Sequence, residues 1–151
     1  MLTAKKKGMI TVLNPAPAKA VSGQTLECCD YFIVNQTEAE FFTGIYPSEE
    51  ETSLRAAEIL KEKGIKTVII TLGGKGSCAV SDGKYRKVNA ESVKVVDTTA
   101  AGDTYVGALA VRLAEGETLD GAMQFASKAS ALTVSKEGAQ QSIPYLLDIE
   151  K

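Results

Sequence analysis

The sequence predicts an α/β fold with a mainly parallel central sheet. Short apolar runs alternate along the chain with stretches of helical periodicity, which is the pattern of strands joined by crossover helices. One apolar run, residues 67–72, is continuous and β-branched, and such a run indicates a strand covered on both faces. The length of 151 residues indicates one domain, 1–151, that is large enough to bury a substantial core.

Composition and charge exclude several classes of function. The 17 basic and 19 acidic residues leave a net charge of −2, so no basic field attracts nucleic acid or an anionic membrane. Histidine is absent, which excludes histidine-based triads and most zinc sites. The three cysteines include an adjacent pair, which favours a reduced, cytoplasmic setting over a disulfide framework. We therefore expect neither nucleic acid nor membrane as a partner.

The first 64 residues predict two strands and three helical segments. The basic start is a helix end with Lys5 to Lys7 in solvent, and the apolar run behind it is too short for a signal peptide or a membrane span. Asn14-Pro15 ends the first strand, and Gly64 stops the last helix. The expected elements are a helix end at 1–7, strands at 9–13 and 31–34, and helices at 36–42 and 48–63.

The remaining residues predict more strands and two long helices. Asp82-Gly83 stands between two short runs and is a strong signal for a two-residue hairpin. Gly116 separates two stretches of helical periodicity. The expected elements are strands at 67–72, 77–81, 84–88 and 93–96, helices at 102–114 and 119–134, a loop at 138–144 and a weak last helix.

One segment between an expected strand and an expected helix reads Asp97-Thr98-Thr99-Ala100-Ala101-Gly102-Asp103. The first amides of a helix have no internal acceptor, and the helix dipole adds partial positive charge there. The small side chains of Ala100, Ala101 and Gly102 leave these amides open to an anion. Asp103 then projects from the first helical turn beside that anion.

A purely structural interpretation of the same segment is also open. The helix dipole favours aspartate in the first turn, and Thr98 or Thr99 is a suitable N-cap. A single local motif matches by chance often enough that the segment alone does not distinguish the two interpretations.

Two further polar segments follow expected strands. Residues 71–76 read Thr71-Leu72-Gly73-Gly74-Lys75-Gly76, and their glycines permit unusual φ values and a close approach of the backbone to a nucleotide. The spacing is not that of a Walker A loop, and a tight strand connection is the simpler alternative. Asn35 with Glu38 three residues later matches a variant of the capping box at a helix start.

Taken in chain order, these segments resemble the ribokinase-like (PfkB) family of carbohydrate kinases. The resemblance covers essentially the whole chain but only the C-terminal half of a typical member. It implies a three-layer, Rossmann-like sandwich that lacks the N-terminal half, which supplies most sugar contacts, and the β-sheet lid. A homo-oligomer and an association with the missing half are both compatible with this arrangement.

The resemblance implies a role for each segment. Asp103 takes the place of the catalytic base, and the turn before it holds the phosphoryl group. In the family, the glutamate at the position of Glu38 acts through water on Mg²⁺ and phosphate. The implied ATP-binding residues are Asn35, Glu38, Thr71, Leu72, Gly73, Gly74, Lys75, Gly76, Gly102, Asp103 and Ser127.

The resemblance also implies a site for a monovalent cation, usually K⁺, beneath the anion site. The loop that follows the second long helix is from local sequence alone a surface loop. In the family this loop encloses the cation together with the segment that precedes the base. The implied ligands are Asp97, Thr99, Thr133, Lys136, Gly138 and Ser142.

The function that follows is an ATP-dependent sugar kinase that transfers the γ-phosphate to a primary hydroxyl, with ribose as the favoured substrate. A physical argument supports the role of Asp103, since positioning of the hydroxyl matters more than basicity in a loose transition state. Two alternatives remain open: a truncated chain that binds nucleotide without catalysis, and a family kinase for fructose, a nucleoside or another alcohol.

Overall fold

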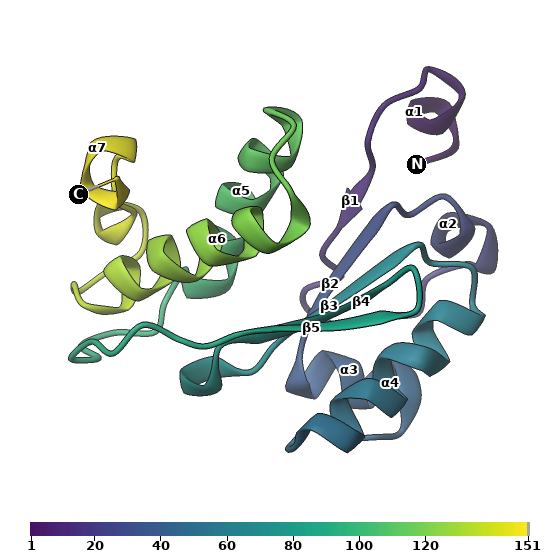
Figure 1. The fold of residues 1–151 in the computed structure, drawn as a ribbon, viewed down its shortest axis with the longest axis horizontal. Helices are drawn as coiled ribbons and strands as arrows, with labels where there is room; N and C mark the ends of the chain where they lie inside the picture. The colour runs from purple at the N-terminus through teal and green to yellow at the C-terminus, as the bar shows by residue number, and fades with distance from the viewer. Residues whose placement is uncertain (151) are drawn as a thin grey trace. The chain divides into compact units, whose positions relative to one another are not determined.

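The computed structural model describes residues 1–150 and contains a five-stranded sheet with the strand order β1-β2-β3-β4-β5 (Figure 1). Contacts divide the chain into two compact units. The first comprises Met1–Gly73 and Ser77–Lys87, and the second comprises Gly74–Gly76 and the chain from Val88 onward. The strands are β1 (Val12–Leu13), β2 (Tyr31–Asn35), β3 (Thr67–Thr71), β4 (Ser77–Ser81) and β5 (Lys84–Val88).

The sheet of the first unit is mixed. β1 pairs with β2 and β2 with β3 in parallel, whereas β3 pairs with β4 antiparallel. The register places Asn35 opposite Thr71, so the last residues of β2 and β3 lie side by side at the C-terminal end of these parallel strands. The predicted two-residue hairpin is confirmed, because Asp82 and Gly83 have positive φ values of 50° and 69° between β4 and β5.

Helices α3 (Gln36–Thr43) and α4 (Glu50–Glu62) cover one face of the sheet (Figure 1). Alternate strand residues point to this face, so Phe32 and Val68 lie in one apolar cluster with Leu60 of α4. The ring of Phe32 meets that of Phe42 edge to face, with 5.4 Å between their centroids. Burial of this cluster, rather than helix propensity, holds these short helices on the sheet.

The N-terminal part of this unit differs from the prediction. The apolar run 9–13 forms a strand only at Val12–Leu13, and a short helix that was not predicted, α2 (Gly23–Glu27), follows it. Its N-cap is Ser22, whose hydroxyl accepts a hydrogen bond from the amide of Thr25. The expectation that Lys5 lies in solvent at the end of α1 (Leu2–Lys6) is wrong, because its ammonium pairs with Asp30.

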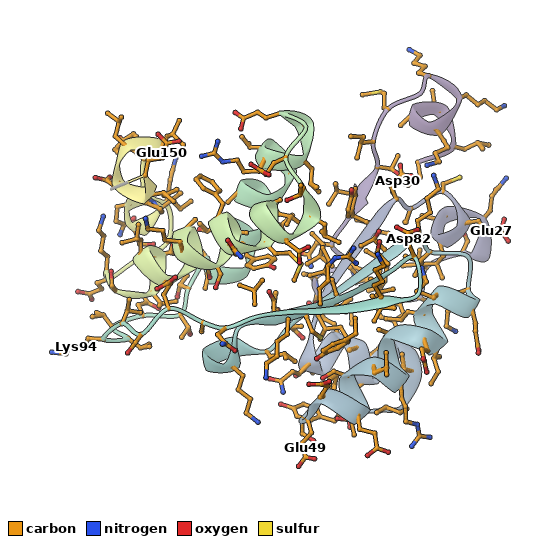
Figure 2. All side chains as sticks on the ribbon, in the orientation of Figure 1. Glu27, Asp30, Glu49, Asp82, Lys94 and Glu150 are labelled. Carbon is orange, nitrogen blue, oxygen red and sulfur yellow. The ribbon has the colours of Figure 1, made fainter. Side chains whose placement is uncertain are left out.

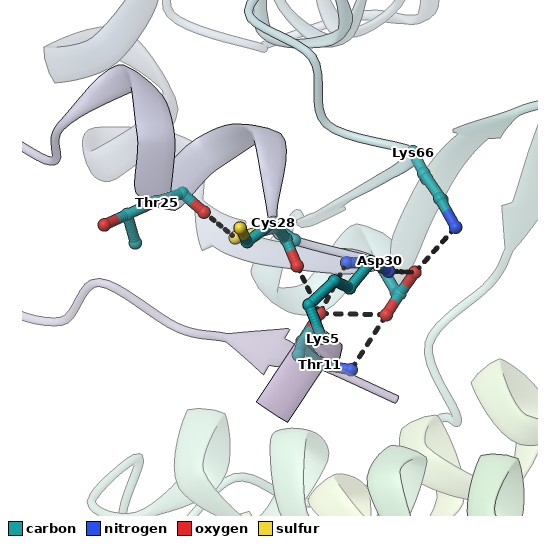
Figure 3. A network of polar contacts seen from close by, with 7 residues as sticks. Lys5, Thr11, Thr25, Cys28, Asp30 and Lys66 are labelled. Carbon is teal, nitrogen blue, oxygen red and sulfur yellow. Dashed lines mark hydrogen bonds and ion pairs between the residues drawn. The ribbon is translucent and has the colours of Figure 1, made fainter. Parts of the chain in front are cut away.

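Asp30 ties the start of β1 to the starts of β2 and β3 (Figure 3). Its carboxylate accepts hydrogen bonds from Lys5, from Lys66 at 3.0 Å, and from the amide and hydroxyl of Thr11 at 3.0 and 2.9 Å. Burial alone would raise the pKa of Asp30, but these four donors outweigh it and hold the pKa far below its usual range.

We expect Asp30→Asn to destabilise the protein by about 2 kcal/mol at pH 7, because the lysines lose their counter-charge. A depressed folded-state pKa adds stability that is complete above the unfolded pKa of about 4 and is lost as the pH falls below it. The free energy of unfolding, measured with urea between pH 7 and pH 2, should therefore decrease less with falling pH for Asp30→Asn than for the parent. Glu58→Gln, at an exposed position of α4, is the control and should follow the parent.

The second unit is built on α5 (Ala101–Ala114) and α6 (Leu119–Val134), which pack against each other, with α7 (Leu146–Ile149) after them. Leu109 and Met123 are fully buried. The expected strand at 93–96 is wrong: the structure assigns no strand there. Val95 and Val96 are more than half exposed, and the amide of Val96 donates to the carbonyl of Val134 instead.

All three cysteines are free and buried. Burial, with the nearby Cys28 and Asp30, raises the pKa of the Cys29 thiol to about 11. Within residues 1–150, no helix is long and apolar enough to span a bilayer.

Candidate functional site

The turn before α5 presents backbone amides rather than a capping side chain. Ala100 is the N-cap residue and has a left-handed conformation, with φ 63°. No side chain caps the helix, so the alternative interpretation, in which Thr98 or Thr99 is the cap, is wrong. The hydroxyl of Thr99 donates instead to Asp97, at 2.7 Å.

Two amides of the first turn remain available. The amide of Ala101 donates to Thr98 and that of Thr104 to Ala100, whereas those of Gly102 and Asp103 have no acceptor among residues 1–150. Both residues are exposed, and a Cβ atom built on Gly102 would meet no atom of another segment within 4 Å. The side chain of Asp103 is exposed beside them. Such a turn is a ready binding site for an anionic group.

Side chains of α6 hold the first turn of α5 in place through two hydrogen bonds. The hydroxyl of Ser130 donates to the carbonyl of Ala101 at 3.0 Å, and that of Thr133 donates to the Thr104 hydroxyl at 3.1 Å in a buried contact. Ser130 was not predicted as a site residue. The sequence contains a pattern that indicates such a role. Three hydroxyl residues, Ser127, Ser130 and Thr133, recur every three positions and so lie on one face of a helix that is otherwise largely apolar.

Asp97 joins the segment before α5 to the loop after α6. One carboxylate oxygen accepts from the amide and hydroxyl of Thr99, and the other accepts from the amide of Gly138 at 3.0 Å. The hydrogen bonds from Thr99, and then that from Gly138, hold the pKa of Asp97 below its usual value. The structure thus brings three of the predicted cation-site residues into direct contact.

The other predicted ligands of the cation lie in or near the same loop. The carbonyl of Thr133 accepts from the amide of Lys136, at 3.2 Å. Ser142 is fully buried, and its hydroxyl donates to the carbonyl of Ala139 at 2.6 Å. Within residues 1–150, no three acidic or cysteine side chains cluster as a metal site. A cation here would therefore be bound by one carboxylate and by carbonyl and hydroxyl oxygens, which suit a hard cation.

Asn35 and Glu38 form the capping box that the local sequence indicates. The Asn35 side chain accepts from the amide of Glu38 at 2.8 Å, and the Glu38 carboxylate accepts from the amide of Asn35 at 2.9 Å. Glu38 is buried, with 7% of its surface exposed. At the same edge, the Thr71 hydroxyl lies 3.5 Å from the carbonyl of Val34. Asn35 and Glu38 therefore have a structural role at the start of α3.

The glycine-rich connection 71–76 includes a 3₁₀ turn at Gly73–Lys75. Gly76 has φ 92°, and a Cβ atom built on it would lie 2.0 Å from the carbonyl oxygen of Val88. The backbone therefore passes too closely here for any other residue. Gly74, by contrast, has open space around it.

Ser127, one of the predicted ATP-binding residues, is buried in the second unit. Its hydroxyl donates to the carbonyl of Asn89, at 3.3 Å. A cavity of about 650 Å³ lies elsewhere, in the first unit, and Tyr31 and Thr67 line it. These are the first residues of β2 and β3, whereas Asn35 and Thr71 are the last, about 13 Å further along the strands. The cavity is therefore separate from the predicted nucleotide segments of this unit.

The predicted residues form one set in each unit. In the first unit, Asn35, Glu38 and Thr71 lie where β2 and β3 end. In the second unit, the set consists of Asp97, Asp103 and Gly138 with their neighbours. Figure 2 shows the side chains of both units on the ribbon.

The chain is similar to carbohydrate kinases over nearly its whole length. The family model for pfkB family carbohydrate kinases matches residues 1–146. The ribokinase of Haemophilus influenzae is 45% identical over 141 residues, which cover 93% of this chain and 46% of that protein. The ribokinase of Staphylococcus aureus is 44% identical over 149 residues, which cover 98% of this chain and 49% of that protein.

A solved structure shows the same fold. The ribokinase of Arabidopsis thaliana, complexed with ribose and ATP, matches with a TM-score of 0.94 and 30% sequence identity. The match covers 99% of this chain and 49% of that one, so this chain spans about half the length of the relatives it matches. The predicted α/β class is confirmed, and the chain belongs to the pfkB family of carbohydrate kinases.

Proposed function

We propose that this chain carries the nucleotide-binding and phosphoryl-transfer part of an ATP-dependent sugar kinase that acts on ribose. The observation that best supports the proposal is the first turn of α5. There the free amides of Gly102 and Asp103 lie beside the exposed carboxylate of Asp103. The two relatives at 44–45% identity are ribokinases, which favours ribose over fructose, a nucleoside or another alcohol.

The chemistry needs one base and one anion-binding turn. Asp103 orients a primary hydroxyl of the sugar and accepts its proton while the hydroxyl oxygen attacks the γ-phosphorus. The bond from that phosphorus to the β,γ-bridging oxygen breaks, and ADP leaves with the bond electrons. The amides of Gly102 and Asp103 donate to the phosphoryl oxygens, where they stabilise the transition state without reorganisation.

ATP, Mg²⁺ and K⁺ are the cofactors in this proposal. The Arabidopsis relative was solved with ATP, which supports ATP as the phosphoryl donor. Glu38 is the only carboxylate in the predicted nucleotide segments of the first unit, and it would act on Mg²⁺ through water. The carboxylate of Asp97, held by Thr99 and Gly138, is the anionic ligand for K⁺.

We expect Asp97→Ala to weaken MgATP binding about tenfold, because the loop at Gly138 loses the acceptor that holds it. Calorimetric titration of the purified chain with MgATP in K⁺ buffer measures the effect. When tetramethylammonium replaces K⁺ in the buffer, the parent should bind MgATP more weakly. The affinity of Asp97→Ala for MgATP should be the same in both buffers. Equal affinity of the two proteins in K⁺ buffer would exclude the proposed role of Asp97.

A second candidate function is nucleotide binding without phosphoryl transfer, because the free amides of Gly102 and Asp103 suit a phosphate whether or not a sugar is bound. Ribose-dependent formation of ADP separates the two functions. Saturable MgATP binding without any turnover on ribose, fructose or nucleosides would favour the non-catalytic function.

A further inference from the structure

The first turn of α5 has few internal constraints. Ala100 holds a left-handed conformation with φ 63°, which costs free energy for an alanine. No side chain caps the helix, and the amide of Ala101 lies as far as 3.3 Å from its acceptor, the carbonyl of Thr98. The orientation of the peptide groups in this turn therefore depends on contacts from outside it.

One such contact comes from Ser130 of α6. Its hydroxyl donates to the carbonyl of Ala101 at 3.0 Å. Carbonyls of a helix already accept from the amide four residues later, so the bond from Ser130 is additional to those that α5 itself needs. α6 packs against α5 and buries the small residues Ala126 and Ala129, and small residues allow two helices to approach closely.

The carbonyl of Ala101 belongs to the same peptide group as the amide of Gly102, one of the two free amides of the turn. This peptide bond is trans, since within residues 1–150 the only cis bond is Ala16-Pro17. In a planar trans peptide, the C=O and N–H bonds point in opposite directions. A hydrogen bond that holds the carbonyl on one side therefore fixes where the amide points on the other. It also polarises the peptide group and strengthens the amide as a donor.

We propose that Ser130 is a positioning residue for phosphoryl transfer, because its hydroxyl orients the Gly102 amide and strengthens it as a donor to the phosphoryl group. The inference rests on the proposed function of the first turn of α5. Ser130 acts through the peptide group that lies between its hydroxyl and the amide hydrogen, and not by contact with phosphate. All the groups involved lie in the second unit.

The test follows the Gly102 amide by NMR and the affinities for MgATP and MgADP by calorimetry. In Ser130→Ala, the nitrogen resonance of Gly102 should move upfield, because its peptide group is less polarised. MgATP should bind about fivefold more weakly. The affinity for MgADP, which lacks the γ-phosphoryl group, should be unchanged. Ser130→Thr keeps the hydroxyl and should restore the resonance and the affinity.

The matched control is Ser135→Ala. Ser135 follows the last turn of α6, and its hydroxyl also donates to a backbone carbonyl, that of Leu132 at 2.7 Å, within its own helix. The control should leave the Gly102 resonance and both affinities unchanged. Alanine is smaller than serine and forms helices more readily, so both alanine variants should fold, which circular dichroism checks.

Two results with Ser130→Ala would overturn the proposal. One is an unmoved Gly102 resonance, and the other is an equal loss of affinity for MgATP and MgADP, which a merely structural role would produce. Failure of the proposed function gives a different result, because the parent would then bind MgATP no more tightly than MgADP. Inorganic phosphate is then the probe, and Ser130→Ala should weaken its binding at the Gly102 amide about fivefold. Equal phosphate affinity of the two proteins, or no phosphate binding by the parent, would also overturn the proposal.

Discussion

Asp103→Asn will reduce ribose-dependent formation of ADP by a factor of about 10² to 10⁴. Asparagine keeps the size of the side chain but cannot accept the hydroxyl proton. Asp103 has an exposed side chain and no hydrogen-bond partner within residues 1–150, so the substitution should leave the fold intact. MgATP binding should therefore persist, and the loss should appear in kcat.

The effect is measured as ADP formation by the chain complemented with the remaining half of a ribokinase, in which the sugar contacts are restored. Asp120→Asn is the matched control, because Asp120 also lies in the first turn of a helix in the same unit and is exposed. It should retain full activity. Full activity of Asp103→Asn would remove the base from the proposed mechanism and leave the turn as an anion-binding element.

Gly76→Ala will destabilise the second unit by about 3 kcal/mol and abolish measurable MgATP binding. The new Cβ atom would lie 2.0 Å from the carbonyl oxygen of Val88 and 2.6 Å from the amide nitrogen of Ala90. Neither backbone atom can move aside as a flexible side chain would. The φ value of 92° adds strain for any residue other than glycine.

Gly74→Ala is the control, since a Cβ atom there meets nothing within 4 Å and its φ is not positive. We expect its stability to lie within about 0.5 kcal/mol of the parent. Urea unfolding followed by circular dichroism gives the stability, and calorimetry gives the affinity. A Gly76→Ala variant as stable as Gly74→Ala would contradict the expected clash, and an unchanged affinity for MgATP would show that the geometry of this connection does not hold the nucleotide.

The elements that were predicted correctly depend on local signals. Asp82-Gly83 specifies its turn because few residues other than glycine adopt positive φ, and Asn35 with Glu38 forms its capping box within four residues. β3 followed from a continuous β-branched run. The small-residue turn and the helix start between Asp97 and Asp103 were recognisable for the same reason, since they are adjacent in the chain.

The errors concern residues whose partners lie far away in sequence. Val93 to Val96 have the residues of a strand, but the backbone of Val96 bonds to Val134. Lys5 has the local context of a solvated helix end, and its partner, Asp30, is 25 residues away. A pattern within one segment contains no information on which distant group satisfies its polar atoms.

The sequence by itself determined the fold class, the hairpin and the capping box of Asn35 and Glu38, and it predicted Asp103 as the candidate base, because these depend on patterns within single segments. Only the tertiary structure decided that Asp97 accepts from Gly138, 41 residues later, and that Ser130 holds the turn at Ala101. It also decided that Gly76 must be glycine and that, within residues 1–150, β2 is the only strand beside β1. These depend on hydrogen bonds and close packing between segments, which form only when the chain brings distant backbone groups together.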